Sequence, residues 1–102
     1  MFVAKVTGAV VSTQKVETMV GQKLLVVEPF RLEPTQRAEL VTTGRTFIAV
    51  DTLGAGEGAV VLVVQGSSAR LAADDKDAPV DAVVIGIVDQ VDIAKHQVFR
   101  AN

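Results

Sequence analysis

The sequence predicts an all-β fold, a small closed barrel of five strands with one short helical turn. Of its 102 residues, 49% are hydrophobic and 20 are valine, a composition typical of packed β structure. Five short apolar segments alternate with turn residues, and none has the length of a long helix. Gly8 stands inside the first segment, where a small barrel needs a bend or a bulge. These are the proportions of an OB-like barrel.

The first two predicted strands are Phe2–Ser12 and Gln22–Phe30. In the first, period-two alternation places one set of residues on a common face: Phe2, Ala4, Val6, Gly8 and Val10. In the second, Leu24–Val27 is continuously apolar, so both faces need cover. We expect Pro29 to close this strand, because proline cannot donate a hydrogen bond to a strand ladder.

The third predicted strand, Arg45–Asp51, follows a polar stretch. This stretch, Arg31–Gly44, is interpreted as a surface excursion, in which Glu33–Leu40 could form about one helical turn. After the strand, the expected turn residues are Asp51, Gly54, Gly56 and Gly58.

The fourth and fifth predicted strands are Ala59–Gln65 and Ala82–Val91. Both have continuously apolar centres, which must be covered on both faces. A chain of this size has little material for that cover, which indicates a neighbouring subunit. Between them, Ser67–Leu71 is the predicted helical turn, with Ser67 as its N-cap. The weaker pattern of Ile93–Asn102 fits a tail strand or a segment packed on a neighbour.

Composition excludes several classes of function for what we expect to be a single domain, residues 1–102. The formal net charge is −2, so the basic excess needed for nucleic-acid binding is missing. The sequence contains no cysteine, hence no disulfide framework and no thiolate metal site. Lys5 interrupts the N-terminal apolar segment, which argues against a secretory signal, and no segment has the length of a membrane helix. We expect no cofactor, no metal and no membrane or nucleic-acid partner.

Side chains that could carry chemistry are few. His96 is the sole histidine and has no second histidine with which to share a metal, so we interpret it as a surface residue. Ser67 and Ser68 follow a glycine but lack the spacing of a nucleophile elbow, which favours turn and cap roles. Arg70 remains open between a lone surface arginine and a planar donor that reaches an adjacent subunit.

Loops and carboxylates give equally little support for a catalytic or ligand site. The glycines of Gly54–Gly58 lead into a strand and not into a helix, so no helix N-terminus is available for a phosphate. The acidic tip Asp74–Asp77 lacks EF-hand spacing and is interrupted by a lysine. Asp81 and Asp89 bracket the fifth strand, but a strand of that length would hold them roughly 26 Å apart. The sequence therefore predicts no catalytic residue.

Three segments together resemble one protein family: GQKLLVVEP (Gly21–Pro29), AVDTLGAGEGAVVLVVQGSSAR (Ala49–Arg70) and PVDAVVIGIVDQV (Pro79–Val91). They are similar to the vertex proteins of bacterial microcompartment shells, the group of ethanolamine-utilisation and carboxysome pentamers. The resemblance covers 44 of the 102 residues. It implies an OB-like barrel that assembles as a homopentamer and caps the vertices of a polyhedral shell in the bacterial cytoplasm.

The resemblance also implies partners and contact residues. The partners are further copies of the chain and hexameric shell proteins, for which the unmatched regions Arg31–Arg45 and Ile93–Asn102 are candidate contacts. A subunit interface is expected at Gly66, Ser67, Ser68, Ala69, Arg70, Pro79, Val80 and Asp81.

Two other functions rank lower. An OB-type binding module for an oligonucleotide or a sugar would need a basic groove with stacking aromatic residues, and the chain has no Trp, no Tyr and a negative balance. An enzyme ranks last, because no set of residues converges on a reaction site.

Overall fold

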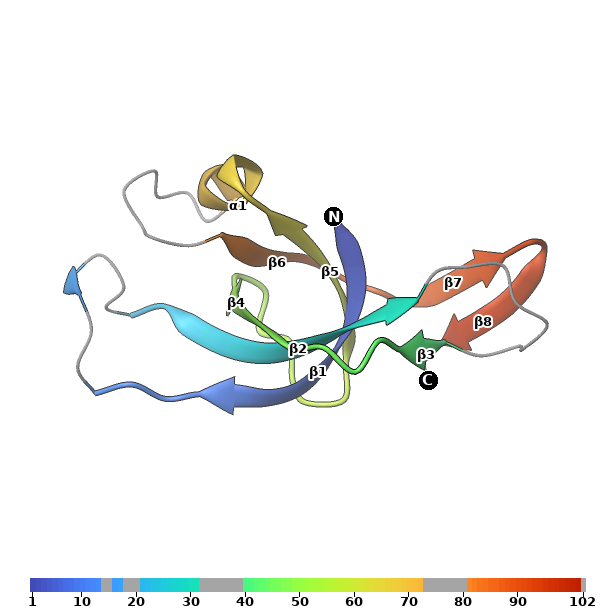
Figure 1. Ribbon diagram of the computed structural model, residues 1–102, viewed down its shortest axis with the longest axis horizontal. Coiled ribbons are helices and arrows are strands. Elements are labelled where there is room, and N and C mark those ends of the chain that lie inside the picture. Colours follow the sequence, from blue (N-terminus) through green and yellow to red (C-terminus); the bar gives the residue numbers. More distant parts are fainter. Residues whose placement is uncertain (14–15, 18–20, 32–39, 73–80, 102) are drawn as a thin grey trace.

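The structure is a computed structural model that describes residues 1–13, 16–17, 21–31, 40–72 and 81–101. Its elements, in chain order, are β1 (Phe2–Val10), β2 (Lys23–Arg31), β3 (Val41–Thr42), β4 (Phe47–Asp51), β5 (Val60–Gln65), α1 (Ser67–Ala72), β6 (Ala82–Ile87), β7 (Gln90–Ile93) and β8 (His96–Arg100). Figure 1 shows the barrel strands and α1 on one side and the β7–β8 hairpin extending from them on the other.

Five strands close into a barrel in the order β1-β5-β6-β4-β2, and a further pairing of β1 with β2 completes the circle. β4 and β6 run parallel, and the other neighbours in the barrel are antiparallel. The short β3 extends the sheet beyond β2. The predicted all-β, five-stranded OB-like barrel with one helical turn is confirmed.

The barrel interior is filled by small and β-branched side chains. The central residues are all between 0% and 4% exposed: Ala4, Val6, Leu25, Val27, Ala49, Ala55, Val61, Val63, Ala82 and Val84. Valine and alanine fit here because a five-stranded barrel leaves a narrow interior, and valine favours the extended backbone.

A second apolar cluster lies on the outer side of the barrel wall. Its members Val50, Val64 and Val83 alternate along their strands with residues of the interior, so they point outward. Ala69 of α1 is fully buried against them. The helix thus supplies part of the cover that the both-face apolar pattern requires.

The bend expected at Gly8 is present as a register shift. Val6 pairs with Val27 and Gly8 pairs with Val26, which leaves Thr7 as the extra residue of a β-bulge. The bulge increases the local twist and helps β1 to pair with β2 on one side and β5 on the other.

The expectation that Pro29 closes the second strand is wrong. Pro29 pairs with Ala4, and β2 continues to Arg31. Its carbonyl accepts hydrogen bonds from the Thr43 amide at 2.9 Å and the Thr43 hydroxyl at 3.1 Å. Proline removes only a donor, so a strand can pass through it where the carbonyl keeps its partners.

The polar stretch before the third strand is only partly a surface excursion. It contains β3, in which Thr42 pairs with Phe30, and this short strand was not predicted. The helical turn suggested for Glu33–Leu40 falls on residues 32–39, which lie outside the described residues.

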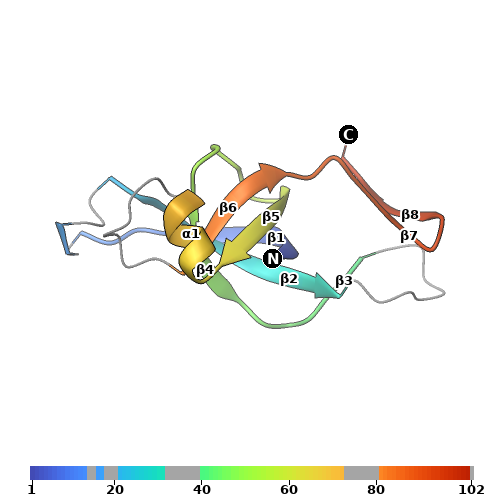
Figure 2. The same ribbon diagram turned by 90° about the horizontal axis from the view of Figure 1, so that it is seen from above.

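The fifth predicted strand, Ala82–Val91, is too long. β6 ends at Ile87, and the chain continues after Asp89 into β7 and β8, which pair only with each other. β6 ends where its antiparallel partner β5 begins. Val60 is the first residue of β5, and its carbonyl accepts a hydrogen bond from the Val88 amide at 2.8 Å. Among the described strands no partner remains beyond that point, and the tail folds into a hairpin of its own, which projects from the barrel (Figures 1 and 2).

Candidate functional site

The structure brings two predicted interface segments together at one end of the barrel. Gln65 pairs with Ala82, and the Gly66 amide donates to the Asp81 carbonyl at 2.9 Å. Gly66 has a φ of +70°, a conformation that favours glycine. Gly66, Ser67 and Asp81 are exposed, whereas Ala69 is buried. Pro79 and Val80, and the side chains of Ser68 and Arg70, lie outside the description.

The start of α1 differs from the expectation. Gly66, and not Ser67, occupies the position before the first helical residue. The Gly66 carbonyl accepts a hydrogen bond from the Ala69 amide at 3.1 Å. Glycine is an accepted N-cap residue, and its positive φ turns the chain from β5 into the helix.

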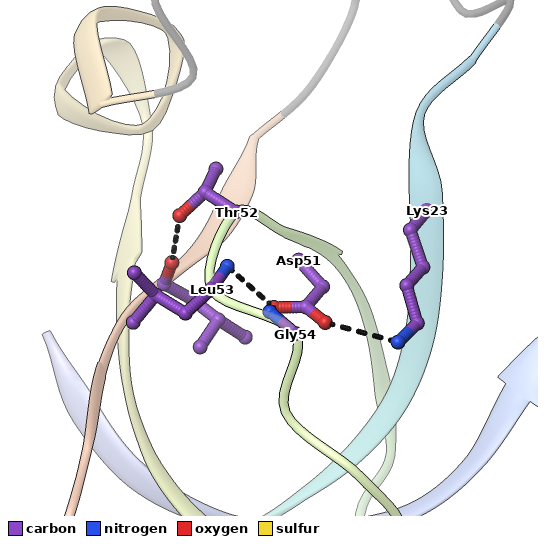
Figure 3. Close-up of polar contacts among 6 residues, drawn as sticks. Lys23, Asp51, Thr52, Leu53 and Gly54 are labelled. Atoms are coloured by element: carbon purple, nitrogen blue, oxygen red, sulfur yellow. Dashed lines mark hydrogen bonds and ion pairs between the residues drawn. The ribbon is translucent and has the colours of Figure 1, made fainter.

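Asp51 organises the turn at the end of β4 (Figure 3). Its Oδ1 accepts hydrogen bonds from the amides of Leu53 at 2.9 Å and Gly54 at 3.0 Å. Its Oδ2 lies 3.4 Å from Lys23 Nζ and has no hydrogen-bond partner in the described part of the chain. Beside it, the Thr52 hydroxyl donates to the Val84 carbonyl at 2.8 Å, which ties the turn to β6. The buried carboxylate thus holds an exposed Asx-type turn at the end of β4.

The glycine loop after this turn packs onto the barrel. Gly54 and Gly58 have φ values of +80° and +88°, and Ala55 between them is 1% exposed. The Gly58 amide donates to the Val6 carbonyl at 2.8 Å, and the Gly56 carbonyl accepts from the Ala59 amide at 3.1 Å. Because the amides of Gly58 and Ala59 are already bonded within the protein, these two are not available to a phosphate.

The candidate chemical residues do not converge on a site. His96 is exposed on β8, and Asp81 and Asp89 are exposed near the two ends of β6. The acidic tip Asp74–Asp77 lies outside the described residues. Within the described ranges, no group of three or more metal-ligating side chains occurs, and no helix has the length and apolarity to cross a membrane.

A groove that sequence reasoning did not predict separates the β7–β8 hairpin from the barrel. It comprises a cavity of about 550 Å³, whose lining includes Lys5, Phe30 and Val98, and a neighbouring cavity of about 300 Å³, whose lining includes Ile87. The two cavities share Gly58, Val60 and Phe99. The sequence signal closest to it was the pair of apolar residues Val98 and Phe99 in the otherwise polar tail.

Large apolar side chains are also exposed elsewhere on the described surface. Some lie at the two ends of β1 or follow it, and others lie on or beside β4 and β6: Met1, Val10, Val11, Val16, Ile48, Leu53, Ile85 and Ile87. A chain with several such groups on adjacent strands has the surface of a protein that binds other proteins.

Comparisons with known proteins agree with this description. The family model described as "Ethanolamine utilisation protein EutN/carboxysome" matches residues 1–89. The microcompartment shell vertex protein GrpN of Rhodospirillum rubrum is 47% identical over 92 residues, which are 90% of this chain and 97% of GrpN.

Solved structures show the same architecture. CcmL of Gloeobacter violaceus superposes with a TM-score of 0.86 at 37% identity. The superposition covers 98% of this chain and 97% of the CcmL chain. The GrpN pentameric microcompartment shell protein of Rhodospirillum rubrum superposes with a TM-score of 0.75 at 44% identity, covering 92% of this chain and 99% of its own.

Proposed function

This chain belongs to the EutN/CcmL family, and from that membership we propose that it is a shell vertex protein, five copies of which cap a corner of a bacterial microcompartment. The observation that carries the proposal is the likeness, over nearly the whole chain, to a pentameric shell protein with the same barrel. The function is structural: the ring supplies five-fold symmetry, which a sheet of hexagonal tiles lacks and needs in order to close.

The barrel has the surface that a cyclic assembly requires. Its outer apolar residues Ile48, Leu53 and Ile85 are 37–49% exposed in the single chain, and burial between subunits would stabilise the ring. We place Gly66–Arg70 and Pro79–Asp81 at or beside this interface. Support comes from the hydrogen bond between Gly66 and Asp81, which joins the two segments, and from the exposure of Ser67.

The other proposed partners are hexameric shell proteins in the same cytoplasmic shell. Five chains of formal net charge −2 carry −10 together, so the ring favours basic patches on its partners. The regions Arg31–Arg45 and Ile93–Asn102 are the proposed contacts with these tiles.

We further propose that the protein is not an enzyme. Its relatives are named as shell proteins, and the described part of the chain holds no converging set of catalytic side chains. The alternative of an OB-type module for an oligonucleotide or a sugar has no observation in its favour.

Two measurements test the vertex function. Native mass spectrometry of the purified chain at micromolar concentration should give the mass of five chains. Co-expression of the cognate shell proteins with this chain should give closed polyhedra that contain it, and without it shells that are open or elongated. A monomeric mass, or equally closed shells from which the chain is absent, would overturn the proposal.

A further inference from the structure

The groove between the β7–β8 hairpin and the barrel is bordered by two strand edges that pair with no further strand of the described chain. On the barrel side, β3 is the last strand of its six-stranded sheet, and on the hairpin side, β8 pairs only with β7. Thr42 of β3 and Val98 and Phe99 of β8 line the same cavity of about 550 Å³ (Figure 1). Two open edges on one groove are a setting in which an extended peptide can add a strand.

The backbone of Thr42 is free on the open side of β3. The Thr43 amide donates to the Pro29 carbonyl at 2.9 Å, which makes these two residues a hydrogen-bonded pair. Opposite residues in an antiparallel ladder alternate between hydrogen-bonded and non-hydrogen-bonded pairs. The next pair, Thr42 with Phe30, is therefore non-hydrogen-bonded, and the N–H and C=O of Thr42 point away from β2.

The same alternation frees the backbone of Arg100 on β8. The Ala101 amide donates to the Asp89 carbonyl at 2.8 Å, so the next pair, Gln90 with Arg100, is non-hydrogen-bonded. The N–H and C=O of Arg100 therefore point away from β7, and Arg100 lines the smaller cavity of the groove. Each edge thus offers a backbone donor and a backbone acceptor at a residue that reaches the groove.

Apolar side chains form the walls of the groove. Phe30, Val41, Val98 and Phe99 line the larger cavity, and all four are half-buried, so each keeps part of its surface open. An apolar side chain that enters the groove is removed from water against these groups, which favours its binding. The walls therefore suit a strand with apolar residues on the face that it turns towards the groove.

The charged side chains in the groove are positive. Lys5 lines the larger cavity and Arg100 the smaller one, and no carboxylate is among the described lining residues. Both cations are exposed, and neither forms an ion pair within the described chain, although Glu28 is the cross-strand neighbour of Lys5. On a chain of formal charge −2, this local positive charge selects an acidic occupant.

We propose that this groove binds an extended segment of another protein in which apolar and acidic residues alternate. The segment lies as a strand between β3 and β8, with its backbone bonded to Thr42 and Arg100. Its apolar side chains pack on Phe30 and Phe99, and its carboxylates reach the exposed ends of Lys5 and Arg100. This binding activity goes beyond the vertex function and does not depend on the number of chains in the ring.

The first test is fluorescence anisotropy of a labelled hexapeptide of alternating valine and glutamate, titrated with the assembled wild-type protein. We expect saturable binding with a dissociation constant below about 100 μM, as for a small, transient interface. Lysine in place of the glutamates should weaken binding at least about tenfold, because it reverses the charge. Methylation of alternate backbone amides keeps every side chain but removes strand hydrogen bonds, and it should weaken binding at least about fivefold.

Two matched variants locate the peptide on the protein. Lys5→Gln and Lys95→Gln each remove one exposed lysine charge, but Lys5 lines the groove, whereas Lys95 lies between β7 and β8 in the turn at the hairpin tip. Lys5→Gln should weaken binding of the valine–glutamate peptide at least about fivefold. Lys95→Gln should change it less than about twofold, with the circular dichroism of both variants unchanged.

Native mass spectrometry of the peptide-bound sample separates this proposal from the vertex function. Peptide bound to intact pentamers supports the groove as a docking site. The proposal is overturned if no peptide binds, if backbone methylation has no effect, or if both lysine variants weaken binding equally. Peptide that binds only as the ring dissociates would show that a second copy closes the groove, which also overturns it. A wild-type chain that is monomeric and still binds the peptide would contradict the vertex function alone.

Discussion

At the scale of single residues, Asp51 stands out as the buried charged side chain of the described barrel. Its carboxylate is fully buried, accepts two backbone amides through Oδ1 and faces Lys23 through Oδ2. A buried charge costs free energy unless it is hydrogen bonded, so the two amides are what make this position tolerable. In return, the carboxylate fixes the turn that carries the chain from β4 towards β5.

We predict that Asp51→Ala lowers the free energy of unfolding by about 2–4 kcal/mol, because two part-buried amide hydrogen bonds lose their charged acceptor. Lys23→Ala should cost less than about 1 kcal/mol, since the lysine side chain is 56% exposed and solvent screens the ion pair. Urea unfolding at fixed protein concentration measures both values. Asp92→Ala, which removes an exposed carboxylate on β7, is the control and should stay within about 0.5 kcal/mol of wild type. A larger loss for Lys23→Ala than for Asp51→Ala would contradict this account.

At the scale of elements, the hairpin turn has an unusual composition. Ala94 and Lys95 both have positive φ, 51° and 68°, as the two central residues of a type I′ turn require. This turn matches the twist of paired strands, but its preferred residues are asparagine and glycine. The hairpin therefore forms at a cost of roughly 1–2 kcal/mol for each residue in this region.

We predict that Lys95→Gly stabilises the hairpin by about 1 kcal/mol, because glycine adopts positive φ without steric cost. Amide hydrogen exchange of β7 and β8 should slow about fivefold. Lys95→Ala removes the same charge but keeps the Cβ atom, and it should leave the exchange rates near those of wild type. Equal slowing in both variants would attribute the effect to charge and not to the backbone.

At the scale of elements, the centres of strands could be predicted from the sequence, whereas some of their ends could not. The centres of β2, β5 and β6 could be predicted, because a short continuous apolar run such as Leu24–Val27 is typical of a buried strand. The sequence also has few signals for a helix. The end of β6 could not be predicted, since Val88 and Val91 continue the valine-rich pattern and the break depends on where β5 begins. The passage of β2 through Pro29 likewise depends on Thr43, whose amide and hydroxyl donate to the Pro29 carbonyl and which the sequence next to Pro29 does not reveal.

At the scale of the whole molecule, the sequence predicts the barrel more directly than it predicts the proposed assembly. Apolar residues on both faces of the strands predicted a need for cover, and α1 meets part of it through Ala69. The meeting of Gly66 with Asp81 follows from the antiparallel pairing of β5 with β6, which the separate segments did not reveal. The groove under the hairpin is a tertiary feature, and no local pattern predicts its shape.

The charge of the whole molecule leads to a further prediction. We expect no measurable binding of single-stranded DNA or RNA at physiological salt, because the net charge is −2 and Trp and Tyr are absent. Fluorescence anisotropy with labelled oligonucleotides measures this directly, with an OB-type single-strand-binding protein as the positive control. Affinity in the micromolar range or tighter would revive the binding-module alternative.

The closure of β1 onto β2 has a consequence for behaviour at high concentration. A closed barrel leaves only short rows of unpaired backbone amides and carbonyls along its described strands, so it offers few sheet edges on which cross-β fibrils could grow. In the described chain, the unpaired edges include the two residues of β3, the outer sides of the small hairpin, and the stretches of barrel strand beyond short pairings such as the two residue pairs of β4 with β6. A protein that must accumulate before it assembles can therefore remain at high local concentration with few templates for aggregation.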